Sequence, residues 1–158
     1  MTGQEHRRLR DLAAGLLFSA AVTALLAQQR QIHHRLLLME KHHLHAELLY
    51  KAMDDPQLAE VLNTYETDVT PERQRQFLYA NIVYGNVLHY CRIGVMNTEE
   101  ALGHMRGICR SRAFRDFWDA TQHHRESLPA DSPEAVLGRL VDRIVTRASE
   151  ERDNWWVA

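Results

Sequence analysis

The residues best suited to chemistry in this 158-residue sequence are histidines that gather in one stretch of predicted helix. Five of the ten histidines lie between residues 33 and 45. His42 and His45 are three residues apart, so on a helix they share a face. Glu40 and His43 form a Glu-x-x-His motif, which in di-metal helical bundles supplies a carboxylate and an imidazole from one helix. These four residues are therefore candidate metal ligands.

The motif is incomplete, which favours other interpretations. A di-metal site needs a second Glu-x-x-His and two further glutamates on facing helices, and the sequence has no second copy of the motif. A solvent-exposed helix face is the simpler interpretation, and a pH-responsive role is another, because imidazoles titrate near neutral pH. His45-Ala46-Glu47 matches the His-x-Glu of zinc deaminases, but their Pro-Cys-x-x-Cys is absent. We therefore predict no cofactor.

A second candidate site combines arginine with aromatic residues. Arg106, Arg110 and Arg112 lie just before Phe114, and such mixtures can stack on bases or hold phosphate. The aromatic spacing also fits a buried helix face beneath an exposed basic one. The net charge of −2 argues against attraction to nucleic acid by charge alone. The three arginines stay candidates for an interaction site.

The end of the sequence offers a third candidate, the pair Trp155-Trp156 close to the carboxyl terminus. Tryptophans at such a place pack on a helical bundle, lie at a membrane interface, or form a displayed tail. A displayed tail would make the chain a precursor or a substrate that a partner recognises.

No motif names a reaction. The sequence lacks G-x-S-x-G, a P-loop, G-x-G-x-x-G and H-E-x-x-H. Cys91 and Cys109 form no C-x-x-C, so two free thiols are the simplest interpretation, with a bridge only in an oxidising compartment. The absences favour a protein without enzymatic activity but do not decide the question.

The elements that must position these residues are helices. No segment shows the alternation of a strand, whereas capping residues recur before helical patterns. We predict helix starts at five sites: Asp55-Pro56, Thr70-Pro71, Asn97 or Thr98, Ser111, and Asp131-Ser132-Pro133-Glu134. The spacing in the stretch after Thr70 predicts the central core helix. The fold class is therefore all-α, with a bundle of about five helices over residues 54–158.

The N-terminal part is the most apolar. Residues 12–27 carry no charge, and as a helix they span roughly 24 Å, somewhat less than a hydrocarbon core of about 30 Å. We therefore predict an anchor segment over residues 1–28, with lipid contact at residues 9–29 and a single-pass location in the cell membrane. Arginines on both sides leave the orientation nearly undecided, with a cytoplasmic bundle slightly favoured. A helix of a soluble protein and a cleaved signal peptide are the alternatives.

A juxtamembrane helix is predicted over residues 29–53. Its apolar residues recur at alternating steps near three and four: Ile32, Leu36, Met39, Ala46, Tyr50 and Met53. Pairing with a second copy as a coiled coil is a weaker alternative, because His43 would fall in the seam. A homo-oligomer therefore stays open.

Three segments resemble an uncharacterised family of small membrane-associated proteins from actinobacteria, largely Streptomyces. They are residues 48–63 (LLYKAMDDPQLAEVLN), 75–81 (RQFLYAN) and 114–119 (FRDFWD). The resemblance covers roughly residues 10–125. It implies an actinobacterial origin, a membrane anchor and a helical bundle, and it implies no activity.

These observations lead to one function and two alternatives. The leading expectation is a membrane-tethered interaction or regulatory module with an unknown protein partner. The first alternative is a precursor or substrate that uses the Trp155-Trp156 tail. The second is a metal-binding or redox protein that uses the histidine-rich helix.

Overall fold

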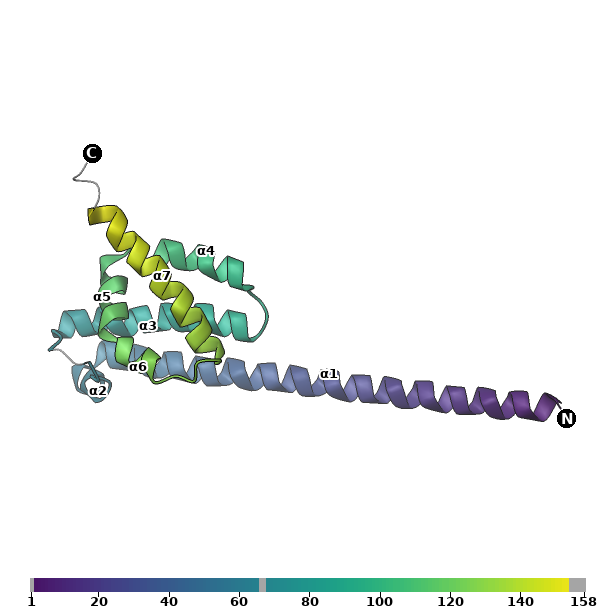
Figure 1. Ribbon diagram of the computed structural model, residues 1–158. Helices are drawn as coiled ribbons and strands as arrows, with labels where there is room; N and C mark the ends of the chain where they lie inside the picture. The colour runs from purple at the N-terminus through teal and green to yellow at the C-terminus, as the bar shows by residue number, and fades with distance from the viewer. Residues whose placement is uncertain (1, 66–67, 154–158) are drawn as a thin grey trace. The chain divides into compact units, whose positions relative to one another are not determined.

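The computed structural model describes residues 2–65 and 68–153, with side chains from residue 15 to residue 150. This part of the chain is helical and contains no strand, so the predicted all-α class is confirmed. The helices are α1 (Thr2–Asp54), α2 (Pro56–Val61), α3 (Pro71–Arg92), α4 (Thr98–Ile108), α5 (Arg112–Ala120), α6 (Gln122–Glu126) and α7 (Pro133–Asp153). They are shown in Figure 1.

The chain divides into two compact units, Met1–Met39 and Glu40–Ala158. The described residues of the first unit all belong to helix α1, whose last turns lie in the second unit, and every residue from 15 to 37 is exposed. The hydroxyls of Ser19 and Thr23 donate to carbonyls four residues earlier in the helix. The predicted division at residues 28 and 53 stays a prediction.

The prediction of a single-pass location in the cell membrane is wrong. Among the helices of the described residues, none is both long enough and apolar enough to span a bilayer. The uncharged run at residues 12–27 is weakly apolar, because nine of its sixteen residues are Ala, Gly, Ser or Thr. It is also followed at once by the polar stretch Gln28–Gln31.

The predicted helix starts are confirmed by side-chain caps. At each, a side-chain oxygen of the residue before the helix accepts a hydrogen bond from a backbone N–H of its first turn, which has no partner within the helix. The capping residues are Asp55, Thr70, Asn97, Ser111 and Ser132. At the other end of α3, Gly94 has φ 71°, a left-handed conformation that glycine adopts without strain.

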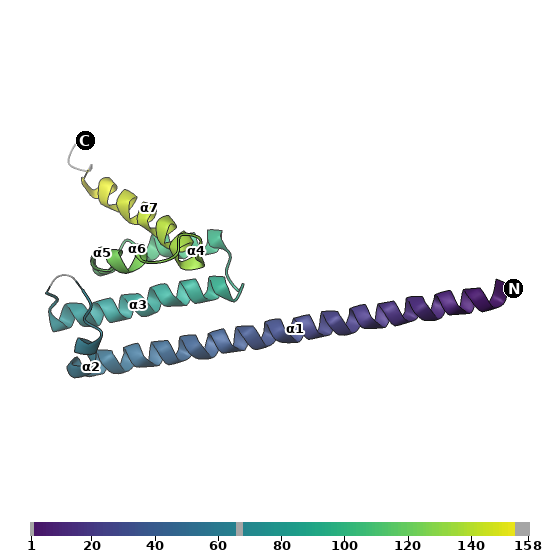
Figure 2. The same ribbon diagram turned by 60° about the horizontal axis from the view of Figure 1, so that its bottom comes forward.

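Helix α3 is the central element of the second unit, as predicted. One face packs into the main core, which α3 shares with α4, α5 and α7. Its opposite side packs against the last turns of α1 and against α2 (Figure 2). The main core consists of Phe77, Ala80, Val87, Ala101, Met105, Cys109, Phe114, Phe117, Trp118, Leu137, Val141 and Val145. The second cluster consists of Leu49, Ala52, Ala59, Leu78 and Ile82.

Candidate functional site

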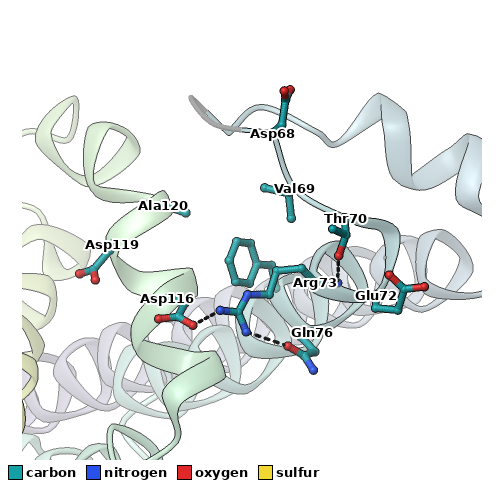
Figure 3. Close-up of a pocket in the computed structure, with 10 residues that line it drawn as sticks. Asp68, Val69, Thr70, Glu72, Arg73, Gln76, Asp116, Asp119 and Ala120 are labelled. Carbon is teal, nitrogen blue, oxygen red and sulfur yellow. Dashed lines mark hydrogen bonds and ion pairs between the residues drawn. The ribbon is translucent and has the colours of Figure 1, made fainter.

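A pocket of about 820 Å³ in the second unit is lined mostly by charged and polar side chains, and we call it the polar pocket. It lies between the start of α3, the loop before it and α5. Its lining is Asp68, Val69, Thr70, Glu72, Arg73, Gln76, Phe77, Asp116, Asp119 and Ala120, as Figure 3 shows.

Arg73 holds the two walls of this polar pocket together. Its guanidinium forms an ion pair with Asp116 of α5, and its Nη1 donates to Gln76 Oε1 at 3.3 Å (Figure 3). Arg112 Nε approaches the same Asp116 carboxylate at 3.8 Å. The charge of Arg73 is thus already compensated, which leaves the pocket with three further carboxylates, on Asp68, Glu72 and Asp119.

The electrostatics of the polar pocket favour a cation. Burial raises the pKa of Asp119, and the charge of Asp116 raises it further, while Arg125 and Arg115 lower it. A bound amine or guanidinium would stabilise the ionised carboxylate, whereas a phosphate would meet repulsion. The Thr70 hydroxyl already accepts a hydrogen bond from the Arg73 backbone N–H. The described lining residues carry carboxylates and the Thr70 hydroxyl but no imidazole.

A second pocket, of about 460 Å³, is lined mainly by carbon. It lies between α3 and the corner where α4 passes into α5, with the end of α1 at one side. Its lining is Met53, Arg75, Gln76, Tyr79, Ala80, Val83, Gly107, Ile108, Ser111, Ala113 and Phe114. We call it the apolar pocket. Its volume and its apolar lining with a few polar groups are those of typical ligand and anchor pockets.

One arginine lines the apolar pocket, and three more are chain neighbours of its lining residues. Arg75 belongs to the lining, and its Nε donates to the Met53 carbonyl at 2.8 Å, which fixes the guanidinium at the edge. Arg106, Arg110 and Arg112 are all exposed, and they alternate along the chain with lining residues. The three arginines predicted as interaction residues therefore lie on the same corner as the pocket.

A buried network at Trp118 holds the surrounding helices in place. Trp118 Nε1 donates to Asp142 Oδ1 of α7 at 2.7 Å, and the Arg125 guanidinium lies 3.8 Å above the indole ring. Arg125 Nη1 also donates to the Trp118 carbonyl at 2.7 Å. The Tyr84 ring meets the indole edge-on at 4.9 Å, and burial raises the pKa of Tyr84 to about 12. These contacts join α3, α5, α6 and α7.

Among the predicted metal ligands, His42 has a defined partner. Its ring stacks on His89 with centroids 4.3 Å apart, and its Nε2 lies 2.6 Å from Asn86 Oδ1. Glu40, His43 and His45 are exposed. Within the described residues, no group of three or more His, Cys, Asp or Glu side chains is arranged to hold a metal ion.

The stacked histidines predict that acid destabilises the second unit. Burial lowers the pKa of His89, and the charges of His42 and Arg92 lower it further. The unfolded chain therefore binds this proton more readily, so stability falls as the pH drops below about 6.5. We expect His89→Gln to reduce the slope of unfolding free energy against pH between neutral and mildly acidic conditions, measured by urea unfolding. The exposed His104→Gln is the control and should keep the wild-type slope; equal slopes in all three proteins would contradict the prediction.

The sequence analysis predicted neither pocket. Arg73 and Asp116 are 43 residues apart, so no local pattern connects them. A usable signal for the apolar pocket was present in the small residues Ala80, Gly107 and Ala113, which leave space between helices.

Both cysteines are free, Cys109 buried and Cys91 partly so. Trp155 and Trp156 lie outside the described residues.

Comparison with known proteins gives a family and no function. No curated protein and no solved structure matches the chain. The predicted membership of an uncharacterised family is confirmed, while the actinobacterial origin and the membrane association inferred with it are not shown. Residues 2–155 match the Family of unknown function DUF6082, and because this match covers almost the whole chain, the protein belongs to that family.

Proposed function

We propose that the protein is a non-enzymatic interaction module whose apolar pocket binds a short segment of a partner protein. The segment carries one or two apolar anchor side chains flanked by acidic residues. The observation that carries the proposal is an apolar pocket whose lining residues at the α4–α5 corner alternate along the chain with exposed arginines.

Two properties of the pocket support a protein segment as the ligand. Interfaces bind through buried apolar anchors surrounded by a polar rim, and arginine is enriched in interfaces relative to the rest of the protein surface. The exposed Tyr79 ring and the edge of Phe114 supply aromatic surface in the lining. The arginines supply charge complementarity to acidic residues, which raises association rates and selects partners.

The two alternative functions gain less support. The tail alternative depends on Trp155 and Trp156, which lie outside the described residues. The metal alternative needs His42 and His45 to share an ion, but His42 is stacked on His89. The leading expectation is therefore kept without its membrane tether.

The chain offers a matched pair of variants to test the proposal. A Cβ added at Gly107, in the pocket lining, meets no atom within 4 Å, and the same holds at Gly103, one turn earlier in α4 and outside the lining. Both Gly107→Leu and Gly103→Leu should fold, and each should gain up to about 1 kcal/mol from helix propensity. Only Gly107→Leu places a side chain in the apolar pocket.

The measurement is binding of labelled peptides by fluorescence anisotropy. One peptide set has leucine and phenylalanine anchors flanked by aspartate and glutamate, and the matched set has lysine in place of the acids. We expect binding of acidic peptides that rising salt weakens, that Gly107→Leu abolishes, and that Gly103→Leu preserves. Equal binding by both variants, or a preference for the lysine set, would show that the apolar pocket is not the binding site.

A further inference from the structure

The first unit presents large apolar side chains that no other residue of that unit covers. All residues of α1 from 15 to 37 are exposed, including large side chains such as Phe18, Leu25 and Leu36. Helices in proteins gain most of their stability from packing an apolar face, so a helical segment of this length with every side chain exposed indicates a missing partner.

The apolar residues of this helix follow the repeat of a coiled coil. Seven positions recur at alternating intervals of four and three residues, which is the a and d spacing of a heptad. They are Phe18, Val22, Leu25, Gln29, Ile32, Leu36 and Met39. Six of the seven are apolar, and the series ends at Met39, before the polar His43 would enter the seam. The residues form one stripe of about 32 Å on a helix.

The flanking charges point to a second copy in parallel orientation. In a parallel coiled coil, a residue at position g faces the residue at position e that lies five positions later in the partner helix. Arg35 is at g and Glu40 is at e, so each pair of helices makes this opposite-charge contact twice. Among the described residues, neither side chain has an ion pair within its own chain.

An antiparallel pair would lose these contacts. It places g opposite g, and the g positions of the series, Ala21, Gln28 and Arg35, include no acid. It also layers a positions against d positions, so Gln29 would lie against an apolar residue. In a parallel, in-register pair Gln29 faces its own copy, and two amides can hydrogen-bond to each other.

We propose that residues 18–40 bind the same segment of a second copy of this chain as a parallel, in-register coiled coil. This surface is separate from the apolar pocket, so the two proposals fail independently.

Neighbouring leucines give the decisive control. Leu36 lies in the seam, whereas Leu37 is at position b and faces away from it, and their exposures are nearly equal at 56% and 51%. By sedimentation equilibrium, the full chain and Leu37→Glu should have twice the mass of one chain, and Leu36→Glu should have the mass of one. A monomeric full chain, or equal behaviour of the two variants, would overturn the proposal.

The orientation is tested by exchanging the charges between two chains. Arg35→Glu alone places two glutamates opposite each other, and Glu40→Arg alone places two arginines opposite each other, so each variant should dimerise several-fold more weakly than the wild type. Mixed together, the two chains form opposite-charge pairs at both contacts, and the mixture should regain wild-type dimerisation. Failure of the mixture to recover would rule out the parallel register, since only that register joins position 35 to position 40.

Discussion

Trp118→Ala should lower the free energy of unfolding by about 3–5 kcal/mol, the range measured for removing a large buried aromatic side chain. The Trp118 side chain is 2% exposed and lies where α3, α5, α6 and α7 meet. Its removal leaves a cavity beside Tyr84 and Phe114 and takes a hydrogen-bond partner from Asp142. Urea unfolding followed by far-UV circular dichroism measures the change.

Trp118→Phe separates packing from hydrogen bonding at the same position. A phenyl ring retains most of the aromatic contacts but loses the indole N–H that donates to Asp142 Oδ1. Since a hydrogen bond contributes about 1 kcal/mol net, we expect a loss well below that of alanine. If the phenylalanine variant were as unstable as the alanine variant, the polar contact rather than the packing would be the main role of Trp118.

The helix starts were predictable because their causes are local. At Thr70 and Asn97, a side-chain oxygen bonds to a backbone N–H three residues later, so the sequence contains both partners. The end of α5 was harder to predict from the sequence. The helix predicted to start at Ser111 ends at Ala120, although no glycine or proline occurs there. The buried hydroxyl of the next residue, Thr121, donates back to the Phe117 carbonyl. That bond depends on burial, which local sequence does not specify.

The two pockets could not be predicted either, because they also depend on how distant helices pack. Helical periodicity shows which residues are apolar, but it does not show which helix covers them or where a gap is left. Arg73 meets Asp116, and His42 meets His89, only because α3 lies between two other sets of helices. The membrane prediction failed differently: it counted uncharged residues at 12–27 without weighing how many are small or weakly apolar.

The second large effect is expected at Leu78, where the two-sided burial of α3 can be tested directly. Sequence spacing predicted that α3 is the central core helix, but not that Leu78, on the side away from the main core, is 2% exposed and packs against Leu49 and Ala59. Leu78→Ala should therefore cost about 2–5 kcal/mol of unfolding free energy, as for other buried leucines.

Leu58→Ala is the matched control for Leu78→Ala, because Leu58 lies on α2, next to the buried Ala59, and is 46% exposed. Its replacement should change stability by no more than about 0.5 kcal/mol, as is usual for surface positions. Urea unfolding of both variants decides between two descriptions of α3. A large difference means that α1 and α2 bury its second face, so the last turns of α1 belong to the folded unit. Equal, small effects would mean that the bundle is complete without them, and the contact between His42 and His89 would then contribute nothing to the pH dependence of folding.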